Sequence, residues 1–483
     1  MLQDIIRERL RKLENFRKSG IEPYPAKTKR THLIGEVLAD FNKLQRSKKK
    51  IFLAGRIIGL RGQGGVVFID LQDWSGKIQL VLKKDNLTKL DFMSYRDNLD
   101  IGDFVECGGA VFKTKRGERS LEVKNIKLLV KSIRPLPDQW YGLEDVEMRL
   151  RQRYLDLLLR PEVREMFIKK NKFWEAVRGY LKTNEFIEVE TPVLEAIPGG
   201  ADAEPFTTHH NALDSDFYLR ISLELPLKKL LVGGFEKAFE IGRVFRNEGI
   251  DAEHLQDYTQ CEFYWAYQDY EELMKFVEKM YKEVIKGTVG GLKTKCQGKV
   301  INWGGKWPRN DYYQLFKKYV GLDLKKATIV DLKKRAQAEG IKVLKAYGRG
   351  KLIDLLYKKL VRQHLIQPCF LINPPVDVEP LAKRLPSDDG RVERMQVIAC
   401  GTELGKGFSE LNDPVDQRRR FEEQMKLRRA GNKEAQMLDE EFLMALEYGM
   451  PPAAGFGLSE RLFAVLMDKP VREAVIFPLM KRK

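Results

Sequence analysis

Alternation of apolar and polar positions is the dominant pattern between residues 51 and 133. Five runs show it, separated by Gly and Asp turns: IFLAGRIIGL, VVFIDLQD, KIQLVLKK, FVECGGAVFKT and SLEVKNIKLL. Successive side chains of a strand point to opposite faces, so each run predicts a strand with one apolar face. Five short strands of this kind predict a small barrel of the oligonucleotide-binding type.

A different period marks the first 20 residues, where apolar side chains recur every three or four positions. The stripe consists of Ile5, Ile6, Leu10, Leu13 and Phe16. The pattern predicts a helix with Arg and Lys on its other faces. Two interpretations stay open: a surface helix packed on the body of the protein, or a basic helix near nucleic acid.

Further along the chain, residues 239–270 predict a hairpin. An apolar run leads into the motif FRNE, a polar turn follows, and a second alternating run ends in aromatic residues. Arg246 and Glu248 are two positions apart, as are Glu262 and Tyr264, so we expect each pair on one face of the sheet. Charges on a central hairpin are costly unless a polar ligand binds there, although a solvated hairpin would also satisfy them.

Linker signals divide the chain into domains. The motif RPLP at residues 134–137 ends the barrel pattern, because proline interrupts strand pairing. We expect an extension and linker at residues 1–50, the barrel and its exit linker at 51–137, and a second domain at 138–483. A Lys-rich and mostly helical insertion is expected at about 290–365 of this second domain.

Composition narrows the class of protein. With 483 residues and 32% charged residues, the chain predicts a soluble protein of two or three domains. A formal charge of +17 favours a polyanionic partner, with nucleic acid as the leading candidate. No apolar run is long enough for a membrane span or a signal peptide, so we expect no membrane contact and a cytoplasmic location.

The cysteines are scattered, and no C-x-x-C pair occurs among them. This spacing argues against a zinc ribbon and against a disulfide framework, so all five are expected to be reduced thiols. They are Cys107, Cys261, Cys296, Cys369 and Cys400.

Several motifs in one order give the chain a family resemblance. FIEVETPVL, which contains Pro192, is followed by PGGADAEPFTTHHNALDSDFYLRISLELPLKKL, FRNE, GFSELNDPVDQRRRFEEQ and GFGLSER. Over nearly its whole length the chain resembles the class II aminoacyl-tRNA synthetases, and within them the lysine enzymes. The resemblance implies an α+β fold: an N-terminal five-stranded OB-fold barrel that reads the anticodon, and a catalytic antiparallel sheet flanked by helices. It also implies a homodimer formed through the first motif.

The activity implied by the resemblance is the activation of L-lysine with ATP and Mg²⁺, followed by transfer to a lysine-accepting tRNA. Two alternatives remain: a paralogue that attaches lysine to a protein, and a tRNA-binding protein whose catalytic site has decayed. An intact barrel argues against the first of these, and the retained catalytic arginines argue against the second. Lysine-dependent exchange of pyrophosphate into ATP would separate the three.

For the nucleotide, the resemblance implies roles for six residues, one of which, Glu403, is also a candidate metal ligand. Arg246 would hold the α-phosphate and the substrate carboxylate, two anions that repel unless a cation bridges them. Glu248 would meet adenine, with Tyr258 on one face of the ring and Arg461 on the other. His254 would also lie at the ATP site. Arg246 and Arg461 are thus the implied catalytic residues, and no side-chain nucleophile is needed.

For lysine, the resemblance implies two groups of residues. Gly200, Glu224 and Glu262 would hold the α-amino group. Tyr264 and Glu410 would meet the ε-ammonium group, since a buried carboxylate gains a charge-assisted hydrogen bond from an ammonium group that reaches it.

In the barrel, Arg61, Phe68 and Gln79 occupy the positions where the family stacks and reads the central anticodon base. From periodicity alone Phe68 is more readily a core residue, and the resemblance shifts the interpretation toward base stacking.

Four features depart from the lysine-enzyme pattern. Gln396 and Glu403 stand where the family has two metal-binding glutamates, which leaves one anionic ligand missing. Glu253 replaces an arginine that would help bind the triphosphate, and the third motif, which contains Arg461, is one residue short. Lys406 replaces an asparagine near the substrate carboxylate.

Lys406 has two candidate partners, the substrate carboxylate and Glu410. We favour the carboxylate, because residues four apart in a strand lie roughly 13 Å apart along the backbone. That span is too long for an ion pair between the two side chains.

Overall fold

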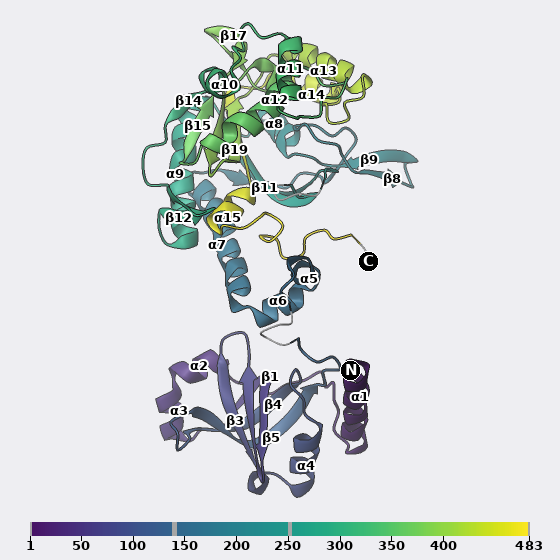
Figure 1. The fold of residues 1–483 in the computed structure, drawn as a ribbon, viewed down its shortest axis with the longest axis vertical. Coiled ribbons are helices and arrows are strands. Elements are labelled where there is room, and N and C mark those ends of the chain that lie inside the picture. The colour runs from purple at the N-terminus through teal and green to yellow at the C-terminus, as the bar shows by residue number, and fades with distance from the viewer. Residues whose placement is uncertain (1, 138–142, 250–253, 482–483) are drawn as a thin grey trace. The chain divides into compact units, whose positions relative to one another are not determined.

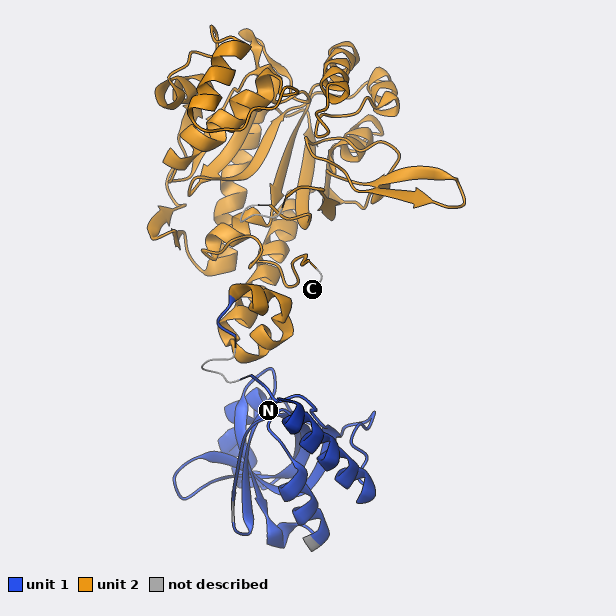
Figure 2. Cartoon of the chain, turned by 45° about the vertical axis from the view of Figure 1, so that its right-hand side comes forward, with its two compact units in different colours: residues 1–145 blue, residues 146–483 orange. Residues whose placement is uncertain are grey.

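The computed structural model describes residues 2–137, 143–249 and 254–481. The chain forms two compact units, residues 1–145 and residues 146–483 (Figure 2). Among the described residues, no helix combines the length and the apolar character that crossing a membrane requires.

The first unit is the predicted barrel with short helices around it. Its strands close in the order β1-β2-β3-β5-β4, with only the β3–β5 pair parallel. The strands are β1 (Ile51–Gln63), β2 (Val66–Gln72), β3 (Lys77–Lys83), β4 (Phe104–Lys113) and β5 (Arg119–Val130). The helices are α1 (Leu2–Lys18), α2 (Ile34–Ala39), α3 (Phe41–Ser47) and α4 (Lys89–Asn98). The five-stranded barrel is thereby confirmed.

Strand β2 shows why the alternating pattern makes a barrel. Val67, Ile69 and Leu71 are buried inside, while the residues between them lie partly exposed on the outer face. Phe16 of α1 joins the same buried cluster and Leu13 is also buried, whereas Ile5 and Leu10 are exposed. The packed-helix interpretation therefore holds for the C-terminal part of the stripe and not for its first residues.

The second unit is built on an eight-stranded sheet with the order β14-β15-β18-β19-β20-β11-β10-β6 (Figure 1). The pairs from β15 to β10 are antiparallel, and the two edge pairs, β14–β15 and β10–β6, are parallel. The strands are β6 (Ile187–Glu188), β10 (Lys237–Phe245), β11 (Asp257–Ala266), β14 (Arg309–Asp311), β15 (Cys369–Ile372), β18 (Arg394–Ala399), β19 (Thr402–Ser409) and β20 (Ala453–Ser459). The predicted α+β class and the hairpin β10–β11 are confirmed.

Helices cover both faces of this sheet. The principal helices are α5 (Val146–Arg151), α6 (Arg153–Leu159), α7 (Pro161–Thr183), α8 (Glu224–Val232), α9 (Tyr270–Val289), α10 (Tyr312–Val320), α11 (Ile329–Ala338), α12 (Arg349–Leu356), α13 (Pro414–Arg429), α14 (Glu440–Glu447) and α15 (Arg461–Leu466). One buried cluster joins α7 and α9 to Phe263 of β11 and Phe456 of β20. A second cluster joins α8, α13 and α14 to Tyr264 of β11 and Phe408 of β19. The alternation of side chains along each strand thus sends neighbours to opposite helical layers.

The segment at residues 290–365 contains α10, α11 and α12, and also the hairpin of β12 (Lys293–Cys296) and β13 (Lys299–Asn302). Two further small sheets accompany the main one: β16 (Arg384–Leu385) with β17 (Asp388–Val392), and β7 (Leu194–Glu195) with β9 (Ser215–Leu219) and β8 (Thr207–His210). The strand expected around Pro192 is reduced to the two-residue pieces β6 and β7, because proline cannot donate to a ladder.

The expectation that all cysteines are reduced is wrong for two of them. Cys296 of β12 and Cys400, in the turn between β18 and β19, form a disulfide with a Cα–Cα distance of 6.4 Å. Cys107, Cys261 and Cys369 are free and buried. The disulfide joins residues 104 positions apart, so linear spacing gives no sign of it. It ties the β12–β13 hairpin to a turn of the central sheet.

Candidate active site

Polar side chains form a row across one face of the central sheet. Glu262 of β11 lies opposite Gly457 of β20, Gly457 opposite Lys406 of β19, and Lys406 opposite Gln396 of β18. Residues directly opposite each other point to the same face. Since Gly457 has no side chain, the sheet is bare between Glu262 and Lys406. A cavity of about 280 Å³, lined by all four residues, lies over this face.

The next row on the same face places Tyr264, Gly455, Phe408 and Arg394 opposite one another. A Cβ atom on Gly455 would lie 2.3 Å from the Tyr264 ring and 2.3 Å from Oε1 of Glu410. Even alanine would therefore displace these two side chains. The glycines of the motif GFGLSER therefore leave space for the cavity above the sheet.

Glu262 is held by four donors. Its Oε1 accepts hydrogen bonds from Ser222 Oγ at 2.6 Å, Leu223 N at 3.0 Å and Gln260 Nε2 at 2.8 Å. Its Oε2 accepts one from the Tyr264 hydroxyl at 2.9 Å. The residue is only 3% exposed, so these bonds replace water and fix the direction of the carboxylate.

A buried ammonium group links the other two carboxylates expected at the lysine site. Lys228 Nζ lies 2.6 Å from Glu224 Oε1, one helical turn earlier in α8, and also pairs with Oε2 of Glu410. Burial raises the pKa of Glu224 to about 7 and raises the pKa of Glu410 well above its usual range. Burial lowers the pKa of Lys228, but the two carboxylates outweigh this and raise it overall.

Glu410 differs from the other predicted lysine-site residues in its position. Gly200, Glu224, Glu262, Tyr264 and Lys406 line the cavity, whereas Glu410 lies behind Gly455 and Tyr264 and is 1% exposed. Lys228 occupies one of its oxygens.

Gly200 brings the loop before α8 close to the site. Its backbone has φ +84°, and a Cβ atom there would lie 2.8 Å from Glu224 Cβ and 2.9 Å from Ser222 Cβ. Both the left-handed conformation and the close approach require glycine.

Arg246 and Glu248 lie beyond the end of β10 at Phe245, so the expectation that they share a strand face is wrong. Arg246 N still donates to Gln256 O, one step beyond the Phe245–Asp257 pair, and the backbone turns after it, where Glu248 N donates to Arg246 O. Arg246 Nε donates to Ile221 O at 3.2 Å, and its guanidinium lies 5.6 Å from the Tyr258 ring centre. This contact directs the arginine into the cavity.

A second, smaller hollow adjoins Arg246. Five of the six residues expected to bind the nucleotide line it: Arg246, Glu248, His254, Tyr258 and Arg461. The sixth, Glu403, lines the larger cavity. Arg461 begins helix α15 and donates from Nη1 to Glu403 O at 3.3 Å, so the shortened third motif still delivers this side chain. Glu253, which replaces an arginine of the family pattern, lies outside the described residues.

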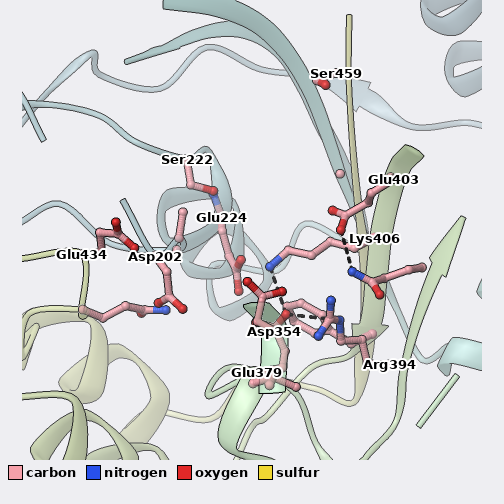
Figure 3. A pocket seen from close by; sticks show the side chains of 18 of the residues that line it. Asp202, Ser222, Glu224, Asp354, Glu379, Arg394, Glu403, Lys406, Glu434 and Ser459 are labelled. Atoms are coloured by element: carbon pink, nitrogen blue, oxygen red, sulfur yellow. Dashed lines mark hydrogen bonds and ion pairs between the residues drawn. The ribbon is translucent and has the colours of Figure 1, made fainter. Parts of the chain in front are cut away.

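Gln396 and Glu403 are neighbours on the hairpin β18–β19. Gln396 Nε2 donates to Glu403 Oε2 at 2.6 Å (Figure 3). Among the described residues, no group of three or more His, Cys, Asp or Glu side chains could hold a metal ion. A resident metal held by protein side chains alone therefore does not fit this part of the chain.

Lys406 has a partner that was not expected. Its Nζ donates to Glu379 Oε2 at 2.9 Å, and Arg394 Nε lies 3.4 Å from the same oxygen (Figure 3). The pairing with Glu410 does not occur, in agreement with the strand-spacing argument.

Two residues of the site were not predicted, and the sequence signals them to different degrees: Lys228, which is buried behind the cavity lining, and Glu379. Lys228 follows Glu224 by four positions in a helical run, which is a recognised ion-pair spacing. Glu379 gave no local signal, because it meets Lys406 across 27 positions of sequence.

In the barrel, the predicted anticodon residues share the outer face. Arg61 of β1 lies opposite Phe68 of β2, and Asp70, two residues after Phe68, lies opposite Gln79 of β3. Arg61 Nη2 pairs with Asp70 at 3.2 Å, and Gln79 Oε1 accepts a hydrogen bond from Ser120 Oγ at 3.0 Å. Phe68 is partly exposed and is not a core residue.

Similarity to known proteins covers both units. The family model for class II tRNA synthetases (D, K and N) matches residues 145–481, and that for an OB-fold nucleic acid binding domain matches residues 51–129. The lysine–tRNA ligase of Moorella thermoacetica is 45% identical over 99% of this chain and 98% of that protein. Those of Roseiflexus sp. (strain RS-1) and Carboxydothermus hydrogenoformans are 44% and 43% identical, over 99% of this chain and 99% and 98% of theirs.

Proposed function

The chain belongs to the lysine–tRNA ligase family of class II aminoacyl-tRNA synthetases, and from this premise we propose how its cavity activates lysine. The enzyme uses ATP to join lysine to tRNA. In the first step the lysine carboxylate attacks the α-phosphorus of ATP, which releases pyrophosphate and leaves lysyl-adenylate. In the second step a hydroxyl group at the 3′ end of the tRNA takes the lysyl group from the adenylate, and AMP leaves. The observation that carries the proposal is the bare glycine strip between the anchored Glu262 and the cationic Lys406.

The α-ammonium group of lysine is assigned to Glu262 and Glu224, with Gly200 leaving room for it. Glu262 is supported in this role by its four donors, which orient the carboxylate before the substrate arrives. An anchored receptor costs little reorganisation on binding.

The ε-ammonium group is assigned to Tyr264 and Glu410. Lys228 uses Oε2 of Glu410, while Oε1 lies against Gly455 in the cavity wall. Oε1 of Glu410 is the proposed acceptor for the ε-ammonium group, because the absence of a side chain at Gly455 leaves this oxygen accessible. Lys406 is assigned to the substrate carboxylate at the other end of the cavity.

Arg246 is assigned to the reacting pair of anions, the lysine carboxylate and the α-phosphate. It lines both the large cavity and the smaller hollow, which supports a position between amino acid and nucleotide. Its planar guanidinium can donate to both anions at once and so reduce their repulsion during attack. Glu248, His254, Tyr258 and Arg461 are assigned to the nucleotide, with Tyr258 and Arg461 on the two faces of adenine.

Magnesium is proposed to arrive with ATP. Mg²⁺ is commonly held by one or two carboxylates together with substrate phosphates and water, so Glu403 and the triphosphate form a sufficient set. Gln396 takes part by orienting Glu403 through its amide. When bound, the ion neutralises charge on the departing pyrophosphate.

The tRNA is assigned to the barrel at residues 51–137, where Arg61, Phe68 and Gln79 would receive the central anticodon base. The catalytic domain is assigned to residues 138–483, with residues 1–50 as an extension and about 290–365 as an insertion. Charging of tRNA is proposed to take place in the cytoplasm.

A homodimer is proposed through the first motif. Its apolar side chains are exposed: Ile187 is 54% exposed, Val193 39% and Leu194 46%. Ile187 lies on β6, the edge strand of the central sheet, where unpaired backbone groups also favour a partner.

The test is lysine-dependent exchange of pyrophosphate into ATP, followed by charging of a lysine tRNA transcript. Exchange and charging together are the expected result. Exchange without charging of tRNA would favour attachment to a protein, and absence of exchange would indicate a decayed site.

A further inference from the structure

Glu379 sits on the cavity wall directly after a short helical turn at Val376–Val378. It is 3% exposed, and both of its cationic neighbours come from the central sheet: Lys406 from β19 and Arg394 from β18. One carboxylate thus faces two cations. Burial alone would raise the pKa of Glu379, but these two cations outweigh it and hold the pKa below its usual range.

Lys406 has a second carboxylate in its surroundings, since Glu224 of α8 and Lys406 of β19 line the same cavity. Burial and Arg394 lower the pKa of Lys406, but Glu379 and, to a smaller extent, Glu224 raise it overall. A lysine side chain has a flexible four-carbon stem, so its ammonium group can move between nearby anions unless one of them holds it. Glu224 is the proposed receptor for the α-ammonium group of lysine, so contact with Lys406 would neutralise it.

We propose that Glu379 is a positioning residue, which keeps Lys406 away from Glu224 and directs it to the carboxylate of the substrate. The proposal rests on the proposed function of the cavity, since it assigns Glu224 to the α-ammonium group and Lys406 to the carboxylate of the same amino acid. Glu379 itself does not touch the substrate. Its effect passes through Lys406.

The arrangement of charges supports the assignment of Glu224 and Lys406 to different groups of the substrate. Glu403 and Asp354 also act on Arg394, whereas Lys406 has Glu379 as its ion-pair partner. The ammonium group of Lys406 is therefore the cation that we place beside the bare strip of the sheet, across Gly457 from Glu262. An α-amino acid carries an ammonium and a carboxylate group on one carbon atom, and the cavity then offers an anion and a cation separated by one strand.

The experiment is a double-mutant comparison in the lysine-dependent pyrophosphate exchange assay, using Glu379→Gln, Lys406→Asn and the double variant. Lys406→Asn should raise the lysine KM by no more than about tenfold, because a neutral amide can still donate to the carboxylate. Glu379→Gln should raise it further, by more than about tenfold, because the released Lys406 competes for Glu224. The ATP KM should stay within about twofold in all three.

The decisive variant is the double one. Its lysine KM should return to that of Lys406→Asn alone, so removal of Lys406 rescues the loss of Glu379. Multiplication of the two single effects, or an unchanged lysine KM in Glu379→Gln, would overturn the proposal. If Glu379→Gln does not fold, the double variant still tests the idea against Lys406→Asn, since any additional loss shows a role for Glu379 independent of Lys406.

Asp388→Asn provides a control. Asp388 belongs to β17, which packs on the Val376–Val378 turn, does not line the cavity and pairs with Lys325 at 2.9 Å, so its loss tests general disturbance of this region. Its lysine KM should remain at the wild-type value. Exchange by the wild-type enzyme tests the proposed function itself: failure there refutes lysine activation, whereas failure of the rescue refutes only the role of Glu379.

Discussion

Lys228 and Glu410 form an ion pair in which neither side chain has exposed surface. The lysine comes from the second turn of α8 and the glutamate from the end of β19, so the pair joins a helix to the central sheet. Glu224 accepts the same ammonium group at 2.6 Å. An internal lysine therefore organises the carboxylates that we assign to the two ammonium groups of the substrate.

Replacement of Lys228 should disrupt both stability and lysine binding. Lys228→Met leaves two buried carboxylates without a cation, and breaking a buried pair in this way costs about 3 to 5 kcal/mol in the free energy of unfolding. The lysine KM should rise while the ATP KM changes little. Denaturant unfolding and exchange kinetics measure the two effects. Lys228→Arg, which keeps the charge, should retain most of the stability, and equal losses in both variants would contradict the role of charge.

The pH dependence of lysine binding follows from Glu224, whose pKa burial raises to about 7. Only the ionised carboxylate attracts an ammonium group, so the lysine KM should fall by roughly a factor of ten between about pH 6 and pH 8. Glu224→Gln should remove this dependence. A lysine KM that stays constant over this range in the wild-type enzyme would show that Glu224 is already ionised or does not bind substrate.

The raised pKa of Glu224 also affects the stability of the folded protein, and this effect has the opposite pH dependence from lysine binding. The pKa of Glu224 in the folded protein lies above its ordinary value of 4.5, so the folded state holds the proton more tightly. The contribution of Glu224 to stability is therefore most favourable at low pH and declines as the pH rises from about 4.5 through 7.

Phe68 should matter for tRNA and not for amino-acid activation. Phe68→Ala removes a partly exposed ring from the outer face of β2, and loss of one stacked base costs about 1 to 3 kcal/mol. The tRNA dissociation constant should rise accordingly, while pyrophosphate exchange stays intact. Trp74, which is 64% exposed on the turn between β2 and β3, offers a control for general loss of aromatic surface. Loss of exchange in Phe68→Ala would place this ring in the structural core.

The Cys296–Cys400 disulfide should stabilise the second unit. It closes a segment of 104 residues, and disulfides typically contribute about 2 to 4 kcal/mol to the free energy of unfolding. Cys296→Ser should lose that amount in denaturant unfolding under oxidising conditions. Reductant should lower the stability of the wild-type enzyme to the same level and leave the variant unchanged; an effect of reductant on the variant would point to another cause.

The periodicity of apolar and polar positions correctly predicted which side chains of a strand share a face. The alternation in VVFIDLQD placed Val67, Ile69 and Leu71 inside the barrel, and the same period on β11 put Glu262 and Tyr264 on the cavity face and Phe263 against α7 and α9. The order of motifs brought Arg246, Tyr258 and Arg461 to one hollow, although nothing in their spacing gives the geometry of that hollow.

Side-chain partnerships between distant segments could not be predicted. The ion pair of Lys406 with Glu379 and the disulfide of Cys296 with Cys400 depend on which strands become neighbours. Arg246 was expected on a strand, but β10 ends one residue earlier, and the backbone turns after Arg246, where Glu248 N donates to Arg246 O. The periodicity of apolar and polar positions gives no information about these contacts.

The central claim is that the cavity selects lysine by its ε-ammonium group through Glu410. The most direct test compares lysine, ornithine and norleucine in pyrophosphate exchange with the wild-type enzyme and with Glu410→Gln. Wild-type enzyme should lose about 1 to 3 kcal/mol of specificity for ornithine, one methylene shorter, and a factor of about 10⁴ or more for norleucine, which lacks the ammonium group. In Glu410→Gln the lysine KM should rise at least about tenfold with the ATP KM nearly unchanged, and discrimination against norleucine should weaken. Equal increases in both KM values, with discrimination preserved, would show that Glu410 serves only to pair with Lys228.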